Sequence, residues 1–207
     1  MGQPVIKYAI DACLNANIFE EVMVSTDDYE IAEISQKFGA KVPFMRSEKT
    51  SDDFCTTSDV LDEVVREYKK LGVEFNNLCC IYPCVPFLTS DLLKDAYAHF
   101  IEKDADTIIP VVNFSYPIQR AFKVENEQLI FAQPEFMTSR SQDLEKMYHD
   151  VGMFYFMKIK NMELIGGEKS VPYLMRESEI QDIDTLEDWR IAEIKYKILK
   201  ELKEKSE

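Results

Sequence analysis

The chain has 207 residues, enough for one domain with a sizeable hydrophobic core. Its 24 basic and 38 acidic side chains give a formal net charge of −14, which disfavours a nucleic-acid partner. Hydrophobic residues make up 46% of the chain, and glycine and proline are sparse. The disordered, collagen-like and low-complexity classes are therefore excluded.

The sequence has no sign of a membrane protein. No apolar run approaches the roughly 18 residues that a membrane-spanning helix needs, and the first residues lack the pattern of a secretory signal. We therefore expect a cytoplasmic protein with no membrane partner. The five cysteines, Cys13, Cys55, Cys79, Cys80 and Cys84, form no C-x-x-C pair, which favours buried, reduced thiols.

Short apolar strands alternate with amphipathic helices along the chain. Helical spacing predicts helices from about residues 4–14, 29–39, 58–71, 90–103, 159–165 and 185–203. Strands are predicted at 20–26, 78–82, 107–112 and 153–157. This order predicts a single α/β domain spanning residues 1–207, with a mostly parallel sheet that helices cover on both faces.

The last predicted helix has a clear start. Thr185 is followed three residues later by Asp188, a shorter relative of the capping box. Helical spacing places Trp189, Ile194 and Ile198 on one stripe, which we expect to face the core.

Residues 113–150 break the alternation of strands and helices. The segment has two prolines, several aromatic side chains and weak periodicity, so we expect it to leave the sheet. A monomer would expose these aromatic residues, which predicts that the excursion mediates dimerisation. Packing of the excursion on its own domain is the alternative.

Three polar or proline-containing loops are candidate ligand sites. Ligands of α/β sheets bind beyond the carboxyl ends of the strands, which is where residues 82–88 (YPCVPFL) are expected. Asp27 and Glu30 lie between a strand and a helix, where helix capping is the alternative role. In the polar stretch 44–60, Arg46 has a planar guanidinium suited to a nucleobase carbonyl or a phosphate, although an ordinary polar loop also fits.

The stretch Gln-Asp-Ile-Asp-Thr at residues 181–185 is a candidate metal site. In an extended backbone, Asp182 and Asp184 would share one face about 6–7 Å apart, with Ile183 turned toward the core. Carboxylates that close repel each other unless a cation lies between them. Mg²⁺ prefers such hard oxygen ligands and also recruits substrate phosphates. The alternative is that both acids complement the dipole of the following helix.

Five segments in chain order carry a resemblance to a known family. They are GQPVIKYAIDA, VSTDDYEIAEISQKFGAKVPFMRS, YPCVPFL, SRSQDLEKMYHDVGMFYF and QDIDTLEDW. Over almost the whole chain, they resemble the CMP-sialic acid synthetase-like cytidylyltransferases. The resemblance implies a Rossmann-like nucleotidyltransferase sheet. It also implies transfer of CMP from CTP to the anomeric hydroxyl of a nine-carbon α-keto acid sugar, with pseudaminic acid favoured over sialic or legionaminic acid.

The resemblance also implies roles for individual residues. Asp182 and Asp184 match the family's catalytic, Mg²⁺-binding pair, Arg46 matches a cytosine contact, and Thr57 matches a hydroxyl near the nucleotide. Roles at the sugar are implied for Tyr82, Arg140, Gln142, Tyr148, His149 and Asp150. The excursion at 113–150 matches the family's dimerisation segment. CTP, an acidic sugar and a second copy of the chain are the implied partners.

The resemblance departs at the beginning of the chain. Family members carry a strand and a basic Gly/Ser-rich loop before the G-x-P motif, which here stands at residues 2–4. We therefore expect this chain to lack that segment and to bind CTP weakly. Two hypotheses stay open, namely an active enzyme and a non-catalytic remnant that keeps the fold as a partner or regulatory subunit.

Overall fold

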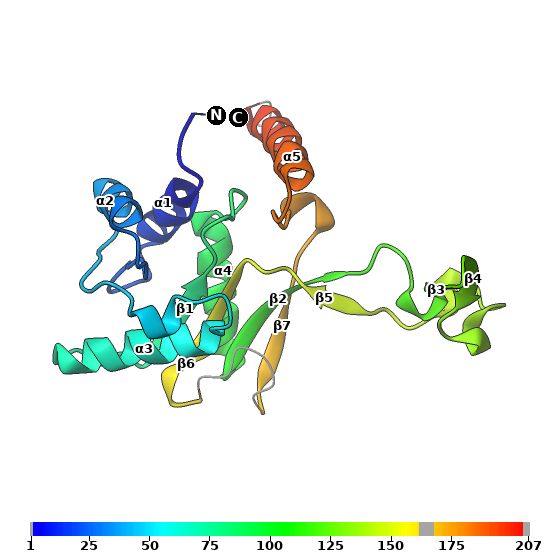
Figure 1. Cartoon of the computed structure of the whole chain (residues 1–207), viewed down its shortest axis with the longest axis horizontal. Helices are drawn as coiled ribbons and strands as arrows, with labels where there is room; N and C mark the ends of the chain where they lie inside the picture. The colour runs from blue at the N-terminus through cyan, green and yellow to red at the C-terminus, as the bar shows by residue number, and fades with distance from the viewer. Residues whose placement is uncertain (1, 162–167, 205–207) are drawn as a thin grey trace.

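The computed structural model of the chain describes residues 2–161 and 168–204. Its α-helices are α1 (Ile6–Ala16), α2 (Tyr29–Lys37), α3 (Thr57–Lys70), α4 (Ser90–Glu102) and α5 (Leu186–Glu204). Its strands are β1 (Asn77–Ile81), β2 (Thr107–Asn113), β3 (Phe122–Glu125), β4 (Gln128–Phe131), β5 (Tyr148–Asp150), β6 (Phe154–Lys158) and β7 (Ser170–Leu174). Figure 1 shows a body of helices around a sheet, with the β3–β4 hairpin standing apart from it.

The main sheet has the order β1-β6-β2-β5, and β7 also pairs with β2. The expectation of a mostly parallel sheet is wrong, because only the β2–β7 pairing is parallel among the described strands. β6 runs antiparallel to both β1 and β2 and lies between them. The reason is the excursion, which leaves the sheet after β2 and returns at the same end through β5, so that the returning chain runs in the opposite direction.

Helices cover both faces of the sheet, as expected. Residues that alternate along β1 and β6 point to opposite faces. On one face, Phe154 and Phe156 belong to a core that includes Leu93 and Phe100 of α4 and several alanines of α1. On the other face, Tyr155 and Met157 pack with Leu61 of α3. The tyrosine at position 155 therefore lies beneath α3, on the side of the sheet that carries the candidate nucleotide residues.

The helices α1 to α4 begin and end close to the predicted residues, and α2, α3 and α4 each begin at a side-chain cap that the sequence encodes locally. Asp28, rather than Asp27, caps α2 by accepting hydrogen bonds from the N–H groups of Glu30 and Ile31. Gly39 follows α2 with φ of +96°, a conformation that residues with a Cβ rarely adopt. Any Cβ at this position would also lie 3.0 Å from the Leu14 side chain.

Several predicted elements differ from the structure. The segment 20–26 forms only an isolated bridge, between Met23 and Lys41, instead of a strand. Residues 159–161 form one 3-10 turn, and the rest of the helix predicted at 159–165 lies outside the described residues. The strand β7 has no counterpart among the predicted strands. It carries a proline, which weakens a strand signal.

The inward face of α5 is also not the predicted one. Ala192 is buried, and Tyr196 and Leu199 pack against the core at helical spacing. The predicted stripe is exposed instead, with Trp189, Ile194 and Ile198 at 41%, 57% and 52% exposure. The rings of Tyr8 and Tyr196 meet edge to face at 5.4 Å, so contact with α1 fixes which side of α5 turns inward.

The five cysteines are free thiols. Cys13 is buried as expected, and burial raises the pKa of its thiol to about 12. Cys84 is exposed, so the expectation of buried thiols is wrong for this residue. Its place between two prolines in the 82–88 loop explains the difference, because the loop leaves the sheet directly after β1.

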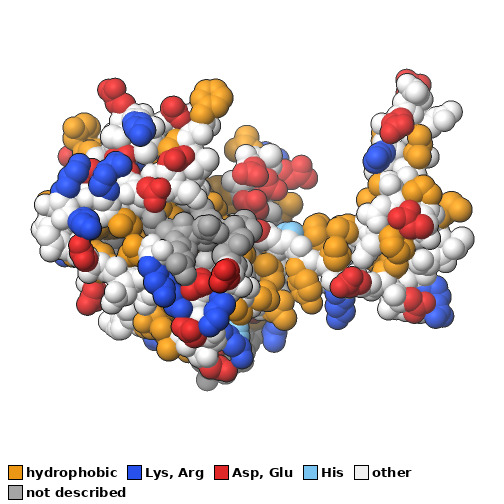
Figure 2. All heavy atoms as spheres, turned by 90° about the horizontal axis from the view of Figure 1, so that it is seen from below, with side chains coloured by type: hydrophobic (Ala, Val, Ile, Leu, Met, Phe, Trp, Pro, Cys, Tyr) orange, Lys and Arg blue, Asp and Glu red, His pale blue; other side chains and the backbone are white. Residues whose placement is uncertain are grey.

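The excursion forms an arm, residues 114–147, which stands away from the body (Figures 1 and 2). Its main element is the β3–β4 hairpin, in which Phe122 lies opposite Phe131. The predicted departure from the sheet is therefore confirmed, although the arm has a small sheet of its own. No helix in residues 2–161 and 168–204 is long and apolar enough to cross a bilayer.

Candidate functional site

The acidic segment before α5 has the predicted alternation. Asp182 and Asp184 are exposed, whereas Ile183 between them is partly buried and packs against the core. The helix start beyond them is fixed by Asp188, whose carboxylate accepts hydrogen bonds from Thr185 N–H at 2.9 Å and from Thr185 Oγ1 at 2.7 Å. The two outward carboxylates are therefore carried on a segment that is anchored at both its core side and its helix side.

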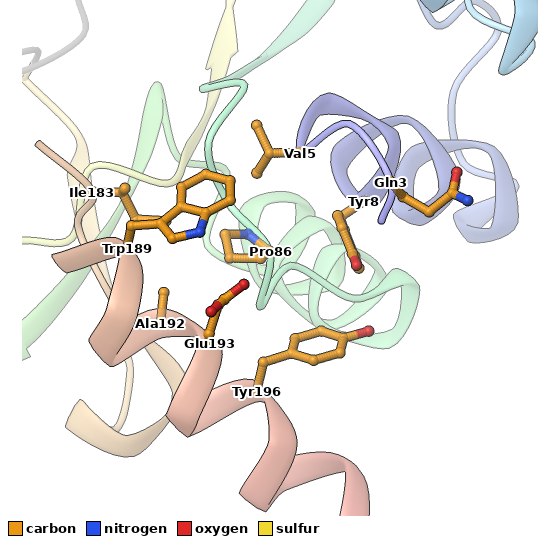
Figure 3. Close-up of a pocket in the computed structure, with 9 residues that line it drawn as sticks. All are labelled: Gln3, Val5, Tyr8, Pro86, Ile183, Trp189, Ala192, Glu193 and Tyr196. Atoms are coloured by element: carbon orange, nitrogen blue, oxygen red, sulfur yellow. The ribbon is translucent and has the colours of Figure 1, made fainter. Parts of the chain in front are cut away.

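Ile183 lines a small apolar pocket of about 50 Å³, together with side chains of the first helical segment, the 82–88 loop and α5. Figure 3 shows Ile183 and Trp189 facing Pro86 of the 82–88 loop, with Val5 and Tyr8 of the first helical segment close by. Ligand pockets usually measure about 300–1,000 Å³, so this pocket is far too small for a nucleotide. Its effect is to hold the acidic segment against the loop that follows β1.

Asp182 and Asp184 have the chemistry of a site for a hard cation. Neither carboxylate forms an ion pair with any residue in the described part of the chain. No group of three or more His, Cys, Asp or Glu residues that could hold a metal occurs there. A cation at this pair would therefore take its other ligands from water and substrate oxygens, which is how Mg²⁺ is usually held.

Arg46 is oriented by three hydrogen bonds on a loop of its own. Its backbone N–H donates to Thr26 O at 2.9 Å, its Nη2 to Asp27 Oδ1 at 2.9 Å, and its Nε to Ser51 Oγ at 3.2 Å. The bond from Arg46 is the main reason that the pKa of Asp27 lies below its usual value. The two side-chain bonds hold the planar guanidinium in one orientation, and the Arg46 side chain remains partly exposed.

Glu63 supports the same loop from beneath, a role that the sequence did not suggest. Its side chain is buried at 3% exposure. It accepts hydrogen bonds from Ser47 N–H at 2.8 Å, Ser47 Oγ at 2.7 Å and Thr50 Oγ1 at 2.5 Å. Burial alone would raise the pKa of Glu63, but these bonds more than offset it and leave the pKa lowered. A glutamate on the apolar side of an amphipathic helix was the only available signal.

Thr57 and Tyr82 lie together at the start of α3. Thr56 caps the helix in a capping box with Asp59, which leaves Thr57 as the first helical residue. The Thr57 Oγ1 and Tyr82 hydroxyl oxygens are 3.2 Å apart and share a hydrogen bond. The structure therefore brings a candidate nucleotide residue and a candidate sugar residue into direct contact.

The remaining candidate residues lie on the arm and at its base. Arg140 and Gln142 are exposed on the arm, where Arg140 Nε pairs with Asp143 at 2.8 Å. The arm stands away from the body, which carries α3 and β1 (Figure 1). Tyr148, His149 and Asp150 form β5, where the arm rejoins the sheet. All three are exposed there.

The fold is shared with a solved structure. The structure titled CMP:2-keto-3-deoxy-manno-octonic acid synthetase complexed with CTP is similar at a TM-score of 0.62 and 16% identity, over 97% of this chain and 90% of that one. The family model described as Cytidylyltransferase matches residues 1–206. The chain therefore belongs to the cytidylyltransferase family.

Two characterised relatives show where the chain stands within that family. It is 38% identical to the pseudaminic acid cytidylyltransferase of Campylobacter jejuni subsp. jejuni serotype O:2, over 96% of this chain and 87% of the relative. It is 28% identical to the CMP-N,N'-diacetyllegionaminic acid synthase of Legionella pneumophila, over 93% of this chain and 84% of the relative. Both names describe enzymes that act on acidic sugars.

Proposed function

We propose that this protein transfers CMP from CTP to the anomeric hydroxyl of a nine-carbon α-keto acid sugar and releases pyrophosphate. The 38% identity to a pseudaminic acid cytidylyltransferase favours pseudaminic acid as the sugar. The observation that carries the proposal is the pair of outward carboxylates, Asp182 and Asp184, anchored beside the loop that follows β1.

Four of the candidate side chains have chemistry that suits this transfer. Arg46 would contact the cytosine through its planar guanidinium, and Thr57 would donate to the nucleotide. Asp182 and Asp184 would hold Mg²⁺, which supplies positive charge to the phosphate oxygens when it is bound. One of these two aspartates would also accept the proton of the sugar hydroxyl, directly or through water, as that oxygen attacks phosphorus.

The arm extends the proposal to a homodimer. Arg140 and Gln142 belong to the arm, which stands away from its own body (Figure 1), so we propose that they meet the acidic sugar in the site of a second molecule. The hairpin beside them exposes Phe122, Val124 and Leu129, an apolar surface that favours a second copy of the chain as the partner.

An acceptor panel tests the proposal. The full chain would be incubated with CTP, Mg²⁺ and pseudaminic, N-acetylneuraminic or legionaminic acid, with pyrophosphate release and the CMP-sugar mass as readouts. We expect the highest kcat/KM with pseudaminic acid. Transfer to none of the acceptors would overturn the proposed function. If the chain still binds CTP in that case, the non-catalytic hypothesis is favoured.

A further inference from the structure

The carboxylate of Asp150 is exposed but held by two donors. Its Oδ2 accepts a hydrogen bond from the Tyr155 hydroxyl at 2.6 Å, and its Oδ1 accepts one from Gly152 N–H at 2.9 Å. Asp150 is the last residue of β5, so its side chain lies where the arm meets the body. An exposed carboxylate with a fixed orientation is suited to accept hydrogen bonds from a ligand's hydroxyl or N–H groups.

Tyr155, which provides the first of these bonds, is itself fixed by packing. Its side chain is only 3% exposed, and it lies with Met157 against Leu61 of α3. Its ring meets the Tyr82 ring edge to face at 5.8 Å. Burial, together with the bond to Asp150, raises the pKa of the Tyr155 hydroxyl, so this group stays protonated and remains a donor at neutral pH.

The two tyrosines link a candidate nucleotide residue to a candidate sugar residue. Tyr82 shares a hydrogen bond with Thr57, the candidate nucleotide residue, and packs on Tyr155, which holds Asp150, the candidate sugar residue. A phenylalanine at position 155 would make the same ring contacts. What the Tyr155 hydroxyl contributes beyond these ring contacts is the hydrogen bond that orients Asp150.

We propose that Tyr155 is a positioning residue for the sugar acceptor. Its hydroxyl fixes the Asp150 carboxylate relative to the Thr57–Tyr82 pair, so that Asp150 accepts hydrogen bonds from hydroxyl or amide N–H groups of the sugar. The inference rests on the proposed function and extends it to a residue that touches no substrate itself. It predicts that loss of the Tyr155 hydroxyl raises the KM for the sugar and leaves the KM for CTP largely unchanged.

The chain contains a matched control for this substitution. The Tyr173 hydroxyl donates to Asp95 Oδ2 at 2.5 Å, and Tyr173 lies in β7 of the same sheet. Tyr155→Phe and Tyr173→Phe therefore each remove one hydroxyl and one bond to an aspartate. Only the first of them disturbs a residue of the candidate site.

The test measures kcat and KM for pseudaminic acid and for CTP in both variants, together with the melting temperature. Tyr155→Phe should raise the KM for the sugar about five- to tenfold, the ratio expected for one hydrogen bond, with the KM for CTP changed less than about twofold. Tyr173→Phe should change neither KM, although it loses a similar bond. In an Asp150→Ala background, Tyr155→Phe should have no further effect on the KM for the sugar.

The outcomes separate the two proposals. If the wild-type chain transfers CMP but Tyr155→Phe matches Tyr173→Phe in every constant, the positioning role is wrong and the proposed function stands. The role is also wrong if Tyr155→Phe still raises the KM for the sugar when Asp150 is alanine. A wild-type chain that transfers CMP to none of the acceptors overturns the proposed function, and the inference with it.

Discussion

Arg46 and Asp27 form an ion pair that joins two loops of the candidate site, with Arg46 Nη2 2.9 Å from Asp27 Oδ1. Both side chains are partly exposed, so solvent screening limits the contribution of the pair to stability. Its effect is geometric. Together with the bond to Ser51, it fixes the plane of the guanidinium, which a lysine at the same position could not reproduce.

Arg46→Lys should therefore weaken the binding of CTP and CMP to the same extent, by about tenfold, because both nucleotides carry the cytosine. Calorimetry with each nucleotide measures the two affinities. Arg66→Lys, on the partly exposed surface of α3, is the matched control and should bind both as the wild type does. Loss of CTP affinity alone would mean that Arg46 contacts the outer phosphates instead.

The acidic pair gives a second prediction. Asp184→Asn should lower kcat at saturating Mg²⁺ by about a hundredfold or more, and Asp182→Asn by somewhat less, because each removes a charged ligand of the cation. Glu187→Gln removes a neighbouring exposed carboxylate and should leave the rate unchanged. Near wild-type rates in both aspartate variants would contradict the assignment of the metal site.

Glu63 makes stability depend on pH in a defined direction. Its pKa in the folded protein lies below the value in the unfolded chain, so its contribution is fully present above the unfolded value of about 4.3. That contribution is lost as the pH falls through the lower, folded pKa. Glu63→Gln should cost about 1–3 kcal/mol of unfolding free energy at pH 7. The difference from wild type should shrink near pH 3.

Urea unfolding at the two pH values measures this effect. Asp62→Asn changes the exposed acid next to Glu63 on α3 and should show no comparable pH-dependent difference. An equal loss of stability in Glu63→Gln at both pH values would mean that the carboxylate charge is not what holds the Ser47–Thr50 turn.

The arm gives a prediction about assembly. Val124 and Leu129 lie opposite each other in the hairpin and are 73% and 71% exposed. Val124→Lys combined with Leu129→Glu keeps an attractive cross-strand pair while it removes the apolar surface. Sedimentation at micromolar concentration should show a dimer for the wild type and a monomer for the double variant.

The control for this experiment is Ile101→Lys, which changes an isolated exposed apolar residue on α4 and should leave the dimer intact. A wild-type chain that sediments as a monomer would contradict homodimerisation. A double variant that stays dimeric would place the interface elsewhere on the molecule.

The helices were predictable because their signals are local. The apolar spacing and the caps of α2 and α3 lie within a few residues of each helix. Strand direction has no such signal. The apolar run of β6 would be the same in a parallel or an antiparallel sheet, so its reversed direction followed only from the path of the arm. The exposed face of α5 was mispredicted because helical spacing does not say which apolar stripe meets Tyr8.

The candidate site shows the same division. Period-two alternation was sufficient to turn Ile183 inward and Asp182 and Asp184 outward. The Thr57–Tyr82 contact joins residues that are far apart in the sequence. The sequence marked the two loops that contain them as separate candidate sites, and no local pattern indicated that the two side chains meet. Glu63 was marked only by its place on the apolar side of α3. Nothing local marked Tyr155 as a polar support, because an apolar side chain would fit its buried position in β6 equally well.

The antiparallel course of β6 also sets the order in which the protein can be assembled during synthesis. β1 and β2 leave the ribosome well before β6, yet β6 lies between them and pairs with both. A nascent chain that has not reached residue 158 therefore has helices α1 to α4 available but cannot close its sheet. Such long-range pairing slows folding and leaves strand edges exposed to other chains in the interval. The arm must emerge before the body closes, so the proposed dimer contact between two arms would become available before either body is complete.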